Sequence, residues 1–163
     1  MYLSIEAFIE DYRTESMFTE KLLRLLTNES LSQGIAEGCR ELGALAWHLI
    51  PPMGLLGPTG LHFQVPPEPN EAALTASAIA DAYSATAAAL MDAVTAQWTD
   101  ETLHEEVDIY GYTWKNGYTL ALFVKHEIHH RGQLTVLMRQ AGLPLIGIYG
   151  PTKEEWLAMS ANG

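Results

Sequence analysis

Three of the six histidines lie within five positions, in the stretch LFVKHEIHHRGQLTVLMRQAG. On a helix that turns 100° per residue, His126 and His130 share one face, whereas His129 points to the polar side. His130 lies in the middle of the apolar stripe and His126 on its edge. A metal ion at roughly 2.0–2.1 Å from each imidazole fits this spacing, which recurs in zinc sites. Taken alone, the spacing also fits two hydrogen-bonded core histidines.

A third ligand is available in the stretch CRELGALAWHLIPP. On a helix, His48 lies at the edge of the apolar face of this segment, and facing helices can bring such residues to one interior point. Three neutral imidazoles with an open coordination position are typical of catalytic rather than structural sites. Glu41 is almost in line with His48, about 10 Å away along the axis. At that distance Glu41 is too far away to bind the same metal ion. It is interpreted either as a base near the metal or, more simply, as an exposed carboxylate.

Other residues that could do chemistry receive more ordinary interpretations. His62 and His104 fall in long connections and are expected to be exposed. Cys39 falls on the apolar side of its predicted helix, which favours a buried structural thiol. Arg131 is expected to anchor a loop or a carboxylate, and Gly132 to permit close approach of a neighbouring helix. No glycine-rich phosphate loop or Gly-x-Ser-x-Gly motif is found.

Four segments with helical periodicity position these residues, and together they predict an all-α four-helix bundle over residues 1–163. The predicted helices span about 4–26, from Ser30 or Ser32 to Ile50, from an Asn70 cap to Trp98, and from 117–119 to Gly142. Long connections at 51–69 and 99–118 separate them, the second with a strand-like piece, and a short helix is expected at 152–159.

Composition and charge exclude several classes of protein. The net charge is −11, from 20 acidic and 9 basic residues, and no basic cluster could neutralise the phosphates of a nucleic acid. No apolar run is long enough for a membrane span, and the N-terminus does not read as a signal peptide. The single cysteine rules out an internal disulfide. We therefore expect a cytoplasmic protein of one domain.

The block HEIHHRGQLTVLMRQAG, followed by P…IYG…EEW, closely resembles the fourth-helix signature of the DinB/YfiT-like proteins. The segment AWHL fits the position of the first histidine of that family, and the resemblance extends over essentially the whole chain. It implies an up-down-down-up bundle that commonly dimerises. It also implies a divalent metal, often nickel or zinc, on His48, His126 and His130. Imidazole ligands also suit iron or copper, and manganese is a further alternative.

The resemblance implies a thiol S-transferase that uses a bacillithiol-, mycothiol- or glutathione-like cosubstrate and acts on a small electrophile. A metal at the three histidines would lower the pKa of a bound water or thiol. The alternative is a non-catalytic metal- or ligand-binding homodimer with a role in stress response. A purely structural bundle with core histidines is a third reading. None of these assigns a catalytic residue or a substrate.

A second apolar strip on the predicted fourth helix bears on assembly. It consists of Ala121, Val124, Ile128 and Thr135. A helix that is apolar on two sides is either deeply buried or shares a contact with another subunit. The strip favours a homodimer.

Overall fold

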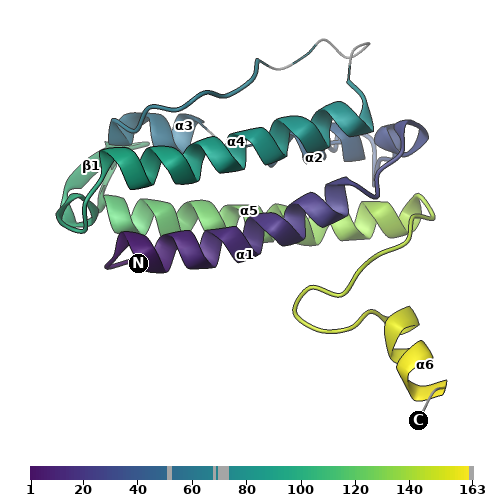
Figure 1. Ribbon diagram of the computed structural model, residues 1–163. Coiled ribbons are helices and arrows are strands. Elements are labelled where there is room, and N and C mark those ends of the chain that lie inside the picture. Colours follow the sequence, from purple (N-terminus) through teal and green to yellow (C-terminus); the bar gives the residue numbers. More distant parts are fainter. Residues whose placement is uncertain (51–52, 68, 70–73, 162–163) are drawn as a thin grey trace.

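Three long helices and two short ones form the bundle in the computed structural model, which describes residues 1–50, 53–67, 69 and 74–161. The long helices are α1 (Ile5–Leu23), α4 (Ala76–Gln97) and α5 (Asn116–Gln140). The fourth position is shared by α2 (Leu42–His48) and the single turn α3 (Met53–Leu56). Helices α1 and α5 run in one direction and α2 and α4 in the other (Figure 1), which confirms the up-down-down-up bundle.

Local capping explains where the long helices begin and end. The side chain of Ser4 accepts a hydrogen bond from the Ala7 amide at 3.2 Å, and Thr75 accepts one from Ala78 at 3.2 Å. The predicted cap Asn70 lies outside the described residues. At the other end of the chain, α5 stops before Gly142, which adopts the left-handed φ of 74° that favours glycine after a helix.

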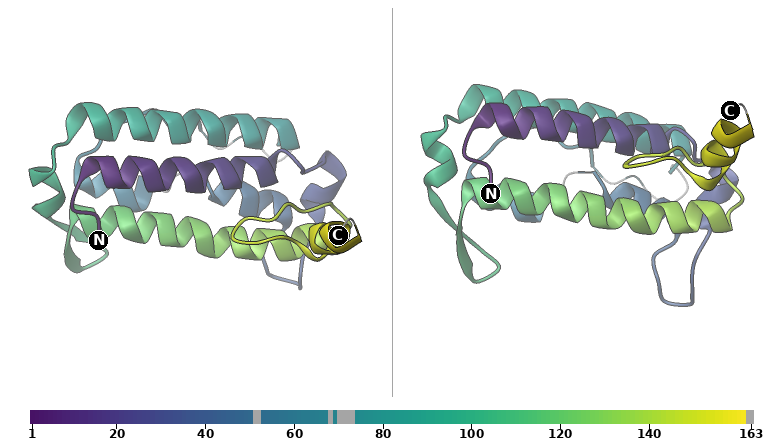
Figure 2. Two further views of the ribbon diagram at one scale, coloured as in Figure 1. Left: turned by 60° about the horizontal axis from the view of Figure 1, so that its bottom comes forward. Right: turned by 90° about the horizontal axis from the view of Figure 1, so that it is seen from below.

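The prediction of a continuous second helix from Ser30 or Ser32 to Ile50 was wrong. Residues Asn28–Ser32 form the 3-10 helix η1, residues 33–41 form a loop, and only Leu42–His48 is α-helical. Glycine weakens a helix, and Gly38 takes a φ of 77°, which a right-handed helix excludes. The loop projects from the bundle beside the C-terminal half of α5 (Figure 2).

The two long connections carry small elements. The first includes α3 and the 3-10 turn η2 (Gly57–Thr59). The second includes the turn η4 (Glu101–His104) and a hairpin of β1 (Glu106–Ile109) and β2 (Tyr112–Lys115), which confirms the predicted extended piece. Tyr110 and Gly111 both have positive φ, 54° and 81°, as a two-residue hairpin turn requires.

The prediction that Gly132 permits close approach was wrong, because a Cβ there would meet open space. The glycine that is needed for packing is Gly117, at the start of α5. A Cβ at Gly117 would lie 2.3 Å from the carbonyl oxygen of Tyr2. The Tyr2 amide also donates to the Gly117 carbonyl at 3.0 Å. The N-terminal segment is therefore packed directly against α5.

The centre of the core holds a group of polar side chains that we call the core polar network: Glu15, Thr19, Tyr83, Glu127 and Arg131. Thr19 and Tyr83 donate hydrogen bonds to Oε1 of Glu127, at 2.7 and 2.6 Å. Arg131 is 2% exposed and pairs with the carboxylate of Glu15, which is 6% exposed. The network joins α1, α4 and α5 at the level of the bundle centre.

The segment after α5 crosses back to this network and ends in α6 (Lys153–Ala161), close to the predicted short helix. The Tyr149 hydroxyl donates to Glu15 and accepts from Arg131. This contact confirms that Arg131 anchors both a carboxylate and a loop. No helix within the described residues is long and apolar enough to cross a membrane.

Candidate metal centre

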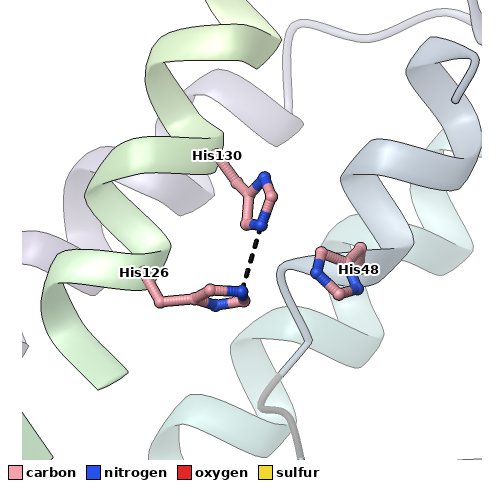
Figure 3. A group of neighbouring side chains, drawn as sticks. All are labelled: His48, His126 and His130. Atoms are coloured by element: carbon pink, nitrogen blue, oxygen red, sulfur yellow. Dashed lines mark hydrogen bonds between the residues drawn. The ribbon is translucent and has the colours of Figure 1, made fainter. Parts of the chain in front are cut away.

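The three predicted histidines come together, from two helices that are far apart in the sequence. His48 is the last residue of α2, and His126 and His130 lie one turn apart on α5. Figure 3 shows the three rings facing one another across the gap between these helices. One nitrogen of each ring lies within 4.8 Å of the others. The Nε2 atoms of His126 and His130 are 3.0 Å apart.

The position of each ring follows from its helix. The spacing of four residues places His126 and His130 on the face of α5 that packs against α2. The His48 ring lies edge-on to both, with ring centroids 5.2 Å from His126 and 4.6 Å from His130. Leu45 and Leu49 flank it in α2 and are buried, which holds the end of this short helix against the bundle.

Gln133, one turn beyond His130, orients that ring. Its side-chain carbonyl lies 2.7 Å from Nδ1 of His130 and accepts a hydrogen bond from it. The amide of the same side chain lies 3.2 Å from Nε2 of His129, to which it can donate. Gln133 thus directs Nε2 of His130 toward the other two rings.

Burial favours the neutral form of two of these imidazoles, His126 and His48. Burial lowers the pKa of His126 to about 4, and the neighbouring histidines add to this effect. Burial is also the largest cause of the lowered pKa of His48, followed by the positive charge of Arg40. Neutral rings offer lone pairs, so these side chains are prepared to act as ligands at neutral pH.

The remaining predicted residues lie apart from this cluster. His62, His104 and His129 are exposed, as expected. Cys39 is exposed in the loop before α2, so the prediction of a buried thiol was wrong. That prediction assumed a helix that does not form there. Glu41 is exposed at the N-cap of α2, at the opposite end of the helix from His48.

Sequence reasoning missed the supporting residue Gln133 and the buried carboxylates Glu15 and Glu127. All three could have been found. Gln133 stands three residues after His130, the spacing at which side chains on a helix meet. Glu127 falls on the apolar arc of α5, and Glu15 fills a gap in the apolar repeat of α1.

Comparison with known proteins agrees with the histidine pattern. The family model for the DinB family matches residues 1–161. The chain belongs to the DinB family. It is 43% identical over 157 residues to the uncharacterized protein YrdA of Bacillus subtilis (strain 168), covering 96% of this chain and 94% of the relative.

Solved structures of other DinB-like proteins share this architecture. One from Bacillus cereus ATCC 10987 is 41% identical, with a TM-score of 0.86 over 91% of this chain and all of the other. A second, from Bacillus subtilis, is 22% identical with a TM-score of 0.69, covering 90% of this chain and 99% of the other, and supports the fold alone. The DinB fold and a three-histidine group that could bind a metal are thus established for this chain.

The second apolar strip of α5, which favoured a homodimer, is partly buried within the protomer. Ala121 and Val124 are 7% and 4% exposed within the protomer, and Ile128 and Thr135 are half-buried. Burial within one chain accounts for their apolar character without a partner. Homodimerisation therefore stays a prediction, for which light scattering is the direct measurement.

Proposed function

We propose that this DinB protein is a metal-dependent enzyme whose divalent ion is held by His48, His126 and His130. The observation that supports this most strongly is the convergence of three imidazoles from α2 and α5. We further propose zinc or nickel as the ion, since three imidazole nitrogens suit both metals. A cytoplasmic location fits this proposal.

The donor set fits such an ion. Two nitrogens that each lie 2.0–2.1 Å from a tetrahedral ion are about 3.3 Å apart. The observed 3.0 Å between Nε2 of His126 and Nε2 of His130 is close to that value. The hydrogen bond from His130 to Gln133 supplies the outer contact that metal-ligating histidines usually make. Few changes in side-chain position are needed to form the site.

When bound, a divalent ion with three histidine ligands supplies a Lewis acid that lowers the pKa of a water or thiol in its open position. Residues of the chain control the surroundings of the ion. The half-buried rings limit access of water, Gln133 holds His130 in one orientation, and Arg40 places a positive charge near the rings.

The reaction class that we propose is S-transfer from a small thiol of the bacillithiol, mycothiol or glutathione type to a small electrophile. A carbon–sulfur bond forms, the electrophile loses its leaving group, and the thiol proton passes to solvent. A non-catalytic metal- or ligand-binding protein with a role in stress response is the alternative. A cavity lined by Gln133, the residue that contacts His130, favours an enzyme over a storage site.

The test compares the untagged parent with His126→Ala, His130→Ala and the matched control His104→Ala, whose histidine is exposed and distant in the sequence. We expect about one equivalent of zinc or nickel in the parent and the control and none in the other two, by elemental analysis of folded protein. Zinc should raise the melting temperature of the parent and control alone. Equal metal content in all four proteins would refute the site.

Activity is tested on the same four proteins with glutathione and a chromogenic electrophile. The proposed reaction predicts turnover in the parent and His104→Ala, and loss of turnover in His126→Ala and His130→Ala. Metal binding without turnover of any thiol of this type would leave the site intact and favour the non-catalytic alternative.

A further inference from the structure

A cavity of about 610 Å³ lies between the projecting loop, α2 and the C-terminal half of α5. Its walls include six residues that matter here: Ile35, Arg40, Leu45, Gln133, Val136 and Leu137. The volume is within the range of about 300–1,000 Å³ that small-molecule sites commonly have. None of the three histidines lines this cavity, but Gln133, which contacts His130, does.

The cavity adjoins the three histidines through α5. Gln133 lines it and also accepts the hydrogen bond from Nδ1 of His130. His126, His130, Gln133 and Leu137 follow one another at spacings of four, three and four residues, so they form one stripe along the helix. The charge of Arg40, on the opposite wall, acts on the rings of His48 and His126. A molecule that contacts Gln133 in the cavity is therefore one turn of α5 away from His130.

The walls combine apolar surface with one positive charge. Ile35 and Val136 line the cavity and are 58% and 48% exposed, so they present apolar surface to a molecule that enters it. Among the described residues that line it, Arg40 is the only charged side chain. These features suit a ligand with an apolar body and a negatively charged group.

Arg40 is also free to bind such a group. Among the arginines in the described part of the chain, Arg24, Arg131 and Arg139 form ion pairs, whereas Arg13 and Arg40 form none. Of these two, Arg40 is the one that lines this cavity. A single guanidinium matches one carboxylate well, while a dianionic phosphate usually needs further cations or helix N-termini.

We propose that this cavity is the substrate pocket of the metal centre and binds a small carboxylate with an apolar body, with the carboxylate on Arg40. This inference rests on the proposed function, because it assigns the substrate class of the same site. Arg40 is then a specificity-determining residue. It holds one end of the substrate while the other end extends along the Gln133 stripe to the histidines.

The experiment measures binding of hexanoate and of its neutral counterpart hexanamide by calorimetry, with zinc-loaded protein. The variants are Arg40→Gln and the matched control Arg13→Gln, which removes the same charge from an exposed position on α1. We expect hexanoate to bind Arg40→Gln about tenfold more weakly than the parent. Arg13→Gln should bind it as the parent does, and hexanamide should bind the parent about as weakly as hexanoate binds Arg40→Gln.

Three results would overturn the proposal: no binding of hexanoate, equal binding to the parent and Arg40→Gln, or equal binding of hexanoate and hexanamide. The zinc content of the same samples separates this failure from failure of the proposed function. One equivalent of zinc with binding that is independent of Arg40 overturns the pocket alone. Absence of zinc from every sample overturns both.

Discussion

Helix α5 carries two polar clusters, and they differ in how their hydrogen-bonding groups are used. Glu127 and Arg131 face α1 and α4, where Thr19, Tyr83 and Glu15 bind them. His126 and His130 each precede one of these residues by one position and face α2. Since neighbouring residues on a helix point about 100° apart, one helix serves two unrelated sites.

The contrast shows what distinguishes a structural cluster from a ligand site. In the core polar network, the side chains are almost entirely buried and each one is hydrogen-bonded to another member, although Oε2 of Glu127 has no partner. In the histidine cluster, one nitrogen of each ring lies within 4.8 Å of the others, the Nε2 atoms of His126 and His130 are 3.0 Å apart, and Gln133 connects the cluster to a cavity. Groups of opposite charge that pair with one another stabilise the fold, whereas ring nitrogens that converge from two helices are suited to hold a cation.

Arg131→Met is expected to have the largest effect, and it should affect the core polar network without affecting the histidine cluster. It leaves the carboxylate of Glu15 buried without its cation, which typically costs about 3–5 kcal/mol of stability. Urea unfolding should show this loss, while the folded fraction still binds zinc, because Arg131 contacts none of the three histidines.

The double variant Glu15→Gln, Arg131→Met is the control for this prediction. It removes both charges and should recover part of the lost stability. A loss of zinc binding in folded Arg131→Met, with stability unchanged, would show that the two clusters are not independent.

The second-largest effect is expected on zinc binding by the histidine cluster. Gln133→Leu removes the acceptor for Nδ1–H of His130 and should weaken zinc binding about 10–100-fold. Gln133 is exposed, so the free energy of unfolding of the metal-free protein should change by less than about 0.5 kcal/mol. Gln133→Glu retains an acceptor oxygen and should restore most of the affinity. Equal affinities for both variants would contradict the orienting role.

A smaller effect is expected from Tyr149→Phe, which disconnects the C-terminal segment from the core polar network. The pKa of Tyr149 is raised to about 12, chiefly by burial, so the hydroxyl stays protonated and donates to Glu15. Losing this contact should cost about 1 kcal/mol in chemical denaturation and leave zinc affinity unchanged. Stability equal to that of the parent would mean that the segment is not anchored by this hydroxyl.

At low pH, Glu127→Gln should change the stability of the protein least among these variants. The difference in stability from the parent should grow as pH rises. Burial raises the pKa of Glu127 above its usual 4.5, so the folded state binds a proton more readily than the unfolded state. Stability from this group is present below pH 4.5 and is lost as pH rises through the folded pKa. The melting temperature of Glu127→Gln should therefore rise relative to that of the parent as pH increases. A difference in melting temperature that does not change with pH would contradict this prediction.

Much of the candidate site could be predicted from the sequence because it depends on helical spacing. His126 and His130 need only the period of α5, and His48 needs only that its segment end as a helix against the bundle. The predicted helix 32–50 was wrong over more than half its length, but its last two turns were correct, and they contain the ligand.

The errors came from features that spacing does not encode. Cys39 and Glu41 were placed on a helix face that Gly38 prevents from forming. The close contact of Gly117 with Tyr2 depends on how the N-terminus packs, which no periodic pattern in α5 reveals. Sequence reasoning succeeded for residues that helical spacing positions, and it failed at the helix break near Gly38 and at the contact between the N-terminus and α5.

The shortness of α2 has a kinetic consequence for the histidine cluster. Isolated helices of fewer than about 12 residues are marginal in water, so seven residues at Leu42–His48 hold their shape through contacts with η1, α4 and α5. Such a segment opens locally more often than a 25-residue helix. We therefore expect local opening of α2 to separate His48 from His126 and His130 more often than those two separate from each other.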